Sequence, residues 1–78
     1  MTDSNPSKEV MAKLAQASYQ MGTKDLGRTK RLENTQNMVS DTDWIVAPDH
    51  TNSEITTYRH KDDPSNIVIS HMGTKLNS

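Results

Sequence analysis

The stretch that decides the fold covers residues 44–74 and reads WIVAPDHTNSEITTYRHKDDPSNIVISHMGT. Most of the β-branched apolar residues of the chain lie in it, grouped into three runs. Val, Ile, Thr and Tyr favour strands and Pro ends strand pairing, so the runs predict strands over residues 44–47, 54–60 and 67–72. The turn-rich segment between the last two strands predicts a carboxy-terminal β-hairpin.

The last of these strands has the character of a buried one. Ile67, Val68 and Ile69 form a continuous β-branched run, which is typical of a strand covered on both faces. We expect this strand to be central in its sheet and buried against a partner chain. The rest of the sequence supplies too few strands and helices to cover it.

The amino-terminal part of the chain predicts one helix, over residues 6–21. Its apolar residues recur at helical spacing, at Val10, Leu14, Ala17 and Met21. Asn5 and Pro6 favour a helix start, because an Asn side chain caps free amides and the first turn does not need the N–H that Pro lacks. Gly22 favours the end of the helix.

The middle of the chain, residues 22–43, has too few apolar residues to define a buried face. We predict an irregular segment there, in which residues 29–38 could form a second helix. The expected architecture is therefore α+β: an amino-terminal helix, an irregular middle and a carboxy-terminal hairpin.

Composition limits how much of this fold the chain can bury alone. Leu, Ile and Val together make up 12 of the 78 residues, Phe is absent and the net charge is −1. So few branched apolar residues indicate a weak core, and so small a net charge does not fit the strongly charged disordered class. We expect the chain to be ordered by partner chains, with these candidate contacts: Trp44, Tyr58, Ile67, Val68 and Ile69. Trp44 suits a packing anchor of the core equally well.

Several classes of protein are excluded or disfavoured. Without cysteine there is no disulfide and no thiolate metal site. The polar start lacks the apolar core of a signal peptide, and no run of about 18 apolar residues could span a bilayer. We expect a soluble protein with no cofactor, located in the cytoplasm or in a virion.

Possible sites have simpler structural explanations. Gly22 to Thr29 approaches a phosphate-binding loop with Arg28 in place of Lys, but a helix rather than a strand precedes it. His50, His60 and His71 could bind a metal together with Asp49 or Asp62, but their spacings of ten and eleven residues match no compact ligand motif. Ser70 and His71 are adjacent on a strand and point to opposite faces, so they cannot share a proton. No catalytic residue, metal ligand or cofactor site is predicted.

The cluster of Arg28, Lys30 and Arg31 raises the question of nucleic-acid binding. Such binding needs a sustained basic surface, which a slightly acidic chain with three aromatic residues does not offer. We expect solvated side chains and no nucleic-acid partner.

Two segments resemble the amino-terminal part of the class-three lipase family, which has the α/β-hydrolase fold. Residues 10–19, VMAKLAQASY, are similar to the family's opening helix. Residues 54–58, EITTY, and 66–74, NIVISHMGT, resemble the hairpin that leads into a strand ending in Arg-Gly-Thr or Arg-Gly-Ser, with Met72 in the place of Arg. The resemblance implies an incomplete hydrolase-like start in which Thr74 matches the oxyanion-hole position. The family's nucleophile elbow, Gly-X-Ser-X-Gly, is absent from this sequence.

Three functions follow from these observations. The first is a non-catalytic structural or interaction protein within a larger assembly, for example a minor component of a virus particle. The second is the amino-terminal fragment of a lipase or esterase whose catalytic residues lie outside this chain. The third is a small regulatory or nucleic-acid-associated protein. The first explains the polar composition and the strand without neighbours, and it is the function that we expect.

Overall fold

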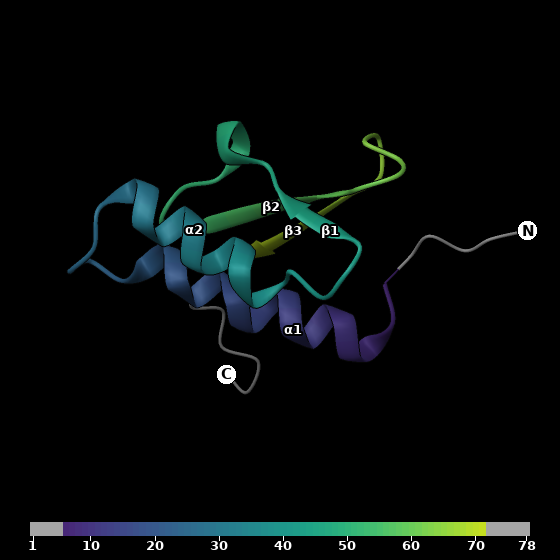
Figure 1. Cartoon of the computed structure of the whole chain (residues 1–78), viewed down its shortest axis with the longest axis horizontal. Coiled ribbons are helices and arrows are strands. Elements are labelled where there is room, and N and C mark those ends of the chain that lie inside the picture. The colour runs from purple at the N-terminus through teal and green to yellow at the C-terminus, as the bar shows by residue number, and fades with distance from the viewer. Residues whose placement is uncertain (1–5, 72–78) are drawn as a thin grey trace, which may run out of the picture.

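The computed structural model of the chain describes residues 6–71 and has an α+β architecture, as predicted. Figure 1 shows the course of the chain from the helices to the sheet. The elements within the described residues are, in order, α1 (Lys8–Ser18), η1 (Tyr19–Gly22), α2 (Arg28–Met38), β1 (Trp44–Val46), η2 (Pro48–His50), β2 (Ile55–His60) and β3 (Ile67–His71).

The strands form one antiparallel sheet in the order β1-β2-β3. The predicted hairpin is formed by β2 and β3, with Tyr58 paired to Val68, and β1 pairs with the other side of β2. The central strand is therefore β2. Within this chain β3 lies at the edge of the sheet and its two isoleucines are exposed, so the chain itself does not make Ile67 to Ile69 a central, covered strand. Burial of this strand against a partner chain stays a prediction.

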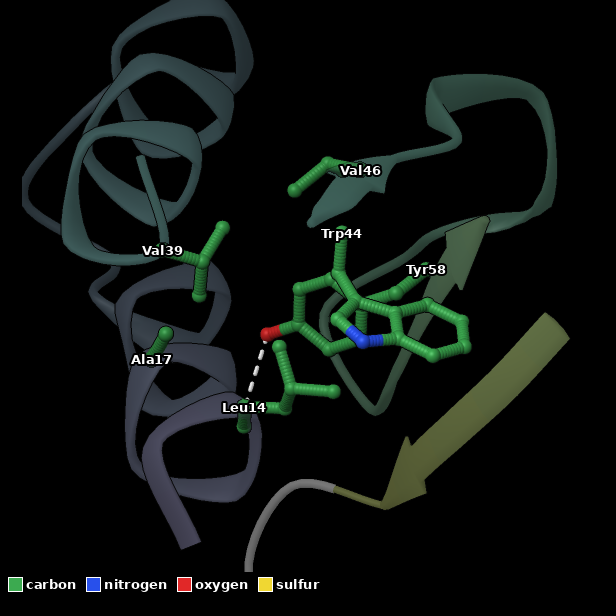
Figure 2. Packing of buried hydrophobic residues seen from close by; sticks show 6 residues of the cluster. All are labelled: Leu14, Ala17, Val39, Trp44, Val46 and Tyr58. Atoms are coloured by element: carbon green, nitrogen blue, oxygen red, sulfur yellow. Dashed lines mark hydrogen bonds between the residues drawn. The ribbon is translucent and has the colours of Figure 1, made fainter. Parts of the chain in front are cut away.

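The core lies between the helices and one face of the sheet. Figure 2 shows the six buried side chains that form it, contributed by α1, the residue that follows α2, β1 and β2: Leu14, Ala17, Val39, Trp44, Val46 and Tyr58. Side chains alternate along a strand, so the same face carries Val68, which packs against this cluster. We call this the inner face of the sheet. Neither α1 nor α2 lies against the opposite face, and the short η2 turn lies beside β2 at one end (Figure 1).

Helix α1 begins later than its sequence predicted. Ser7 is the N-cap, and its Oγ accepts a hydrogen bond from the Val10 N–H at 3.2 Å. Pro6 precedes the cap and does not occupy the first turn, so the predicted start at Asn5 and Pro6 is wrong. A Ser side chain satisfies the free N–H groups of the first turn as well as Asn does. The helical course continues as the η1 turn up to Gly22, with Met21 buried.

The middle of the chain is not irregular, because it contains α2. Polar side chains hold this helix in place. The Arg31 guanidinium donates to the carbonyls of Leu26 and Met21, at 2.8 and 3.2 Å. Gln36 Oε1 accepts from the Val46 N–H at 2.9 Å and so ties α2 to β1. Hydrophobic periodicity does not report such contacts, and α2 therefore has little signal in the sequence.

Tyr58 links the central strand to α1 through the core. Its ring is fully buried and its hydroxyl donates to the Leu14 carbonyl at 2.7 Å (Figure 2). Burial raises the pKa of this hydroxyl above its ordinary value, because the phenolate would lose its hydration. Folding therefore favours the neutral form of the side chain.

We expect Tyr58→Phe to lower the free energy of unfolding by about 1 kcal/mol, because it removes this hydrogen bond from the core. The contribution of Tyr58 is fully present below pH 10.0, the ordinary pKa of tyrosine, and it declines above that pH because the unfolded chain ionises first. Urea unfolding at neutral and at alkaline pH measures both effects. Tyr19→Phe is the matched control, since Tyr19 is exposed. Equal effects of the two substitutions would contradict the buried hydrogen bond of the Tyr58 hydroxyl.

Thr56 and Thr57 are adjacent in β2 and both are buried, but among the described residues only one of the two hydroxyls has a hydrogen-bond partner. Thr56 Oγ1 has no hydrogen-bond partner within residues 6–71, whereas Thr57 Oγ1 donates to the His50 carbonyl at 2.6 Å. A buried hydroxyl without a partner costs free energy, and one with a partner does not.

We expect Thr56→Val to raise the free energy of unfolding by about 1 kcal/mol and Thr57→Val to lower it by about the same amount. Both substitutions keep the β-branched shape, so each is the control for the other. Thermal melts of the two variants measure the difference. A loss of stability in Thr56→Val equal to that in Thr57→Val would show that the Thr56 hydroxyl has a partner.

Candidate functional site

The face of the sheet that points away from the helices carries an exposed apolar surface. The strand register places Ile45, Arg59 and Ile67 side by side across the three strands, and Ile69 lies next to Thr57. Ile45 is 46% exposed, and Ile67 and Ile69 are each 52% exposed. We call this surface the outer face and define it by these residues: Ile45, Ile55, Thr57, Arg59, Ile67 and Ile69.

Part of the outer face is hollowed into a groove of about 500 Å³. Thr57, Arg59, Ile67 and Ile69 line it from the strands. The segment after β1 lines it with Ala47 and His50, and the turn between β2 and β3 lines it with Pro64 and Ser65. The groove is therefore open to solvent and lies between two loops.

The first of these loops is fixed by Thr51. Its hydroxyl donates to the Ala47 carbonyl at 2.8 Å and accepts from the Thr57 N–H at 3.1 Å, so it is inserted into the ladder between β1 and β2. Thr51 is itself buried. This insertion ends the pairing of the two strands and directs the chain over the Thr57 end of the outer face.

Arg28 fixes the same loop from the α2 side. Its guanidinium donates to the carbonyls of Pro48 and Thr51, at 2.7 and 3.1 Å. Hydrogen bonds from a charged donor are stronger than those between neutral groups. The η2 side of the groove is therefore held by the fold and does not depend on a ligand.

Arg59 is the cation at the centre of the outer face. It is exposed, and within residues 6–71 its side chain has no hydrogen bond or ion pair. Its neighbours across the strands are Ile45 and Ile67, both apolar. A partner surface that combines apolar side chains with a carboxylate would match both the isoleucines and the charge of Arg59.

The candidate contacts predicted from sequence separate into two groups. Trp44 and Tyr58 are buried in the core of the chain itself, so they are not available to a partner. Val68 is half-buried on the inner face and packs against that core. Only Ile67 and Ile69 are exposed. Thr74, the position matched to an oxyanion hole, lies outside the described residues.

The histidines do not come together. His60 and His71 lie at opposite ends of the sheet, since His60 pairs with Trp44 and His71 pairs with Ile55. The ring of His60 instead contacts Trp44 edge-on, with ring centroids 5.1 Å apart. Among the residues that the structure describes, no cluster of three or more His, Asp or Glu side chains could hold a metal ion.

The remaining motifs of the sequence have structural roles. In the loop from Gly22 to Thr29, Gly27 is the N-cap of α2 and η1 precedes the loop, so no strand leads into it. The cations of the basic cluster have partners: Arg28 and Arg31 donate to backbone carbonyls, and Lys30 forms an ion pair with Glu33 at 3.7 Å. Ser70 is buried and His71 exposed, as expected for opposite faces of a strand.

Sequence reasoning missed Ile45 and Arg59 as parts of this surface. Alternation along β1 and β2 is the signal that could have found them, since residues 45, 59, 67 and 69 fall on one face once the strands are paired in this register. The sequence did not fix the register of the three strands, because the short strand β1 offers too few residues to specify how it pairs with β2.

Comparisons with protein-family models, with curated proteins and with solved structures found no match to this chain. Within residues 6–71, none of the helices has the length and the apolar character needed to cross a bilayer.

The two faces of β3 should respond differently to substitution. We expect the double variant Ile67→Thr/Ile69→Thr to change the free energy of unfolding by less than about 0.5 kcal/mol, since both side chains are exposed on the outer face. Val68→Asp should lower it by about 2 kcal/mol or more, because the carboxylate would face the core. Urea unfolding measures both. Equal losses in the two variants would contradict the assignment of the faces.

Proposed function

We propose that this chain is a non-catalytic interaction protein that joins a larger assembly by docking another protein chain on its outer face. One observation carries the proposal: three half-exposed isoleucines surround Arg59 on a sheet face against which neither α1 nor α2 packs. A sheet with an apolar face is stable when a second layer covers that face. Apolar patches that remain exposed commonly mark interaction sites.

The chemistry of the outer face specifies the kind of partner. The isoleucines favour an apolar surface, and Arg59 favours a partner that places a carboxylate among its apolar residues. An arginine that becomes enclosed by such a partner binds the carboxylate in a bidentate manner, which adds orientation as well as affinity. The loops at Ala47 and Pro64 flank the groove and would direct an elongated element along it.

A second candidate uses the same surface. If the chain is the start of a class-three-type hydrolase, the outer face would be covered by later parts of that hydrolase, and the catalytic residues would lie there. A native protein heavier than 8.8 kDa that carries a Gly-X-Ser-X-Gly elbow would favour this candidate. A native mass equal to that of the chain would favour the first.

Site-specific cross-linking tests the proposed docking. A photoreactive amino acid at Ile45, introduced in the cells from which the chain comes, should give one product of discrete mass. The same group at Lys24, which is exposed in the turn before α2, should not. Ile45 is suitable because it lies on the outer face and on the strand farthest from β3.

The charge of Arg59 provides the specific control for this product. We expect Arg59→Glu to abolish the cross-link from Ile45 and Arg59→Lys to retain part of it, because the partner is expected to present a carboxylate. Reconstitution with the purified partner should reproduce the same pattern. Equal products from Ile45 and Lys24, or a product that Arg59→Glu leaves unchanged, would refute docking at the outer face.

A further inference from the structure

The two edges of the sheet differ in their free backbone groups. The hydrogen bond from the His60 N–H to the Asn66 carbonyl, at 3.0 Å, sets which residues of β3 face β2. In an antiparallel pair the hydrogen-bonded residues alternate, so Val68 and Ser70 also turn their backbone groups towards β2. The N–H and C=O groups of Ile67 and Ile69 therefore point away from the sheet, at its open edge.

The edge at β1 is closed by contrast. The Ala47 N–H donates to the Thr57 carbonyl and the Lys61 N–H donates to the Asp43 carbonyl, so the same alternation turns Trp44 and Val46 outward. Both of their N–H groups have side-chain acceptors, Thr42 Oγ1 at 3.2 Å and Gln36 Oε1 at 2.9 Å. A further strand cannot add to β1 without breaking these bonds.

The edge at β3 also lacks the features that prevent strand addition. Natural edge strands are commonly protected by charged side chains, proline or a bulge. The segment from Asn66 to His71 contains no Lys, Arg, Asp, Glu or Pro, and its pairing with β2 is regular. Ile67 and Ile69 present exposed apolar side chains beside the outward backbone groups.

We propose that β3 pairs with β3 of a second copy of this chain, in antiparallel orientation about a two-fold axis at Val68. In this register Ile67 of each copy lies opposite Ile69 of the other, and each such pair exchanges both N–H···O=C bonds. Every outward backbone group of these two residues is then satisfied. A two-fold interface must be complementary to itself, and an uncharged segment whose two isoleucines face each other meets that condition.

The pairing joins the two sheets and leaves both outer faces on the same side, because the axis is perpendicular to the sheet. The four isoleucines of the two β3 strands then form one apolar stripe between the two Arg59 side chains. The pairing itself depends only on the edge; its consequence, a doubled docking surface, rests on the proposed function. Such a surface fits a partner that carries two copies of the element that docks on the outer face.

Two charge variants test the register. Ile67→Glu/Ile69→Glu places like charges opposite each other in both cross-strand pairs, and Ile67→Glu/Ile69→Lys places opposite charges there. Both variants lose the same apolar contacts, and both place Glu next to Arg59 within the chain. Like charges directly opposite each other destabilise strand pairing, whereas opposite charges stabilise it.

Sedimentation equilibrium over a concentration series should show the unaltered chain doubling its mass from 8.8 kDa. The Glu/Glu variant should keep the single-chain mass, and the Glu/Lys variant should double it, less so at high salt. A single-chain mass of the unaltered protein at every concentration would refute the pairing. Equal behaviour of the two variants would refute the register.

Amide hydrogen exchange gives a second readout that needs no substitution. Exchange of the Ile67 and Ile69 amides should slow as the concentration rises, whereas exchange at Trp44 and Val46 should not change. Uniform changes at both edges would contradict pairing through β3. The cross-link from Ile45 is read separately, so loss of the double mass with the cross-link intact would refute only the pairing, and loss of the cross-link with the double mass intact would refute only the docking.

Discussion

The hydrogen bond from the Tyr58 hydroxyl to the Leu14 carbonyl is the interaction on which the rest of the structure depends (Figure 2). It joins the central strand to α1 through the middle of the core. An apolar cluster of six buried side chains is small for a chain of this length, and apolar contacts alone do not specify one arrangement of helix and sheet. A buried donor must find its acceptor, and this requirement fixes the position of α1 relative to β2.

Polar side chains supply what the small core cannot. Arg31 holds the turn before α2, Gln36 connects α2 to β1, and Thr51 fixes the loop that crosses the outer face. Each of these bonds replaces a hydrogen bond to water and so adds only about 1 kcal/mol. Their main effect is geometric: they determine which elements are adjacent, and they close one edge of the sheet while the other stays open.

These polar contacts also explain what could be predicted from the sequence. The first helix was predictable, because its buried positions are mostly apolar and follow a period of 3.6 residues. The hairpin was predictable because its β-branched and aromatic residues favour strands and a turn-rich segment separates them. Helix α2 was expected only as an alternative to an irregular segment, over residues 29–38, since Arg31 and Gln36 have backbone partners that no periodicity reveals. The run from Ile67 to Ile69 suggested a central strand, but its place in the sheet was decided by β1, a strand of three residues that occupies the other side of β2.

Arg59 also limits how this chain can associate with itself. Two copies stacked outer face to outer face would bring the two Arg59 side chains, each among isoleucines, towards each other, and the repulsion would act in a partly dehydrated contact. Pairing along β3 keeps the two cations apart and uses backbone groups that the outer face does not offer. Docking of a carboxylate-bearing partner uses the side chains and leaves the edge free. Under the two proposals the face and the edge select different partners, and both can be occupied in one assembly.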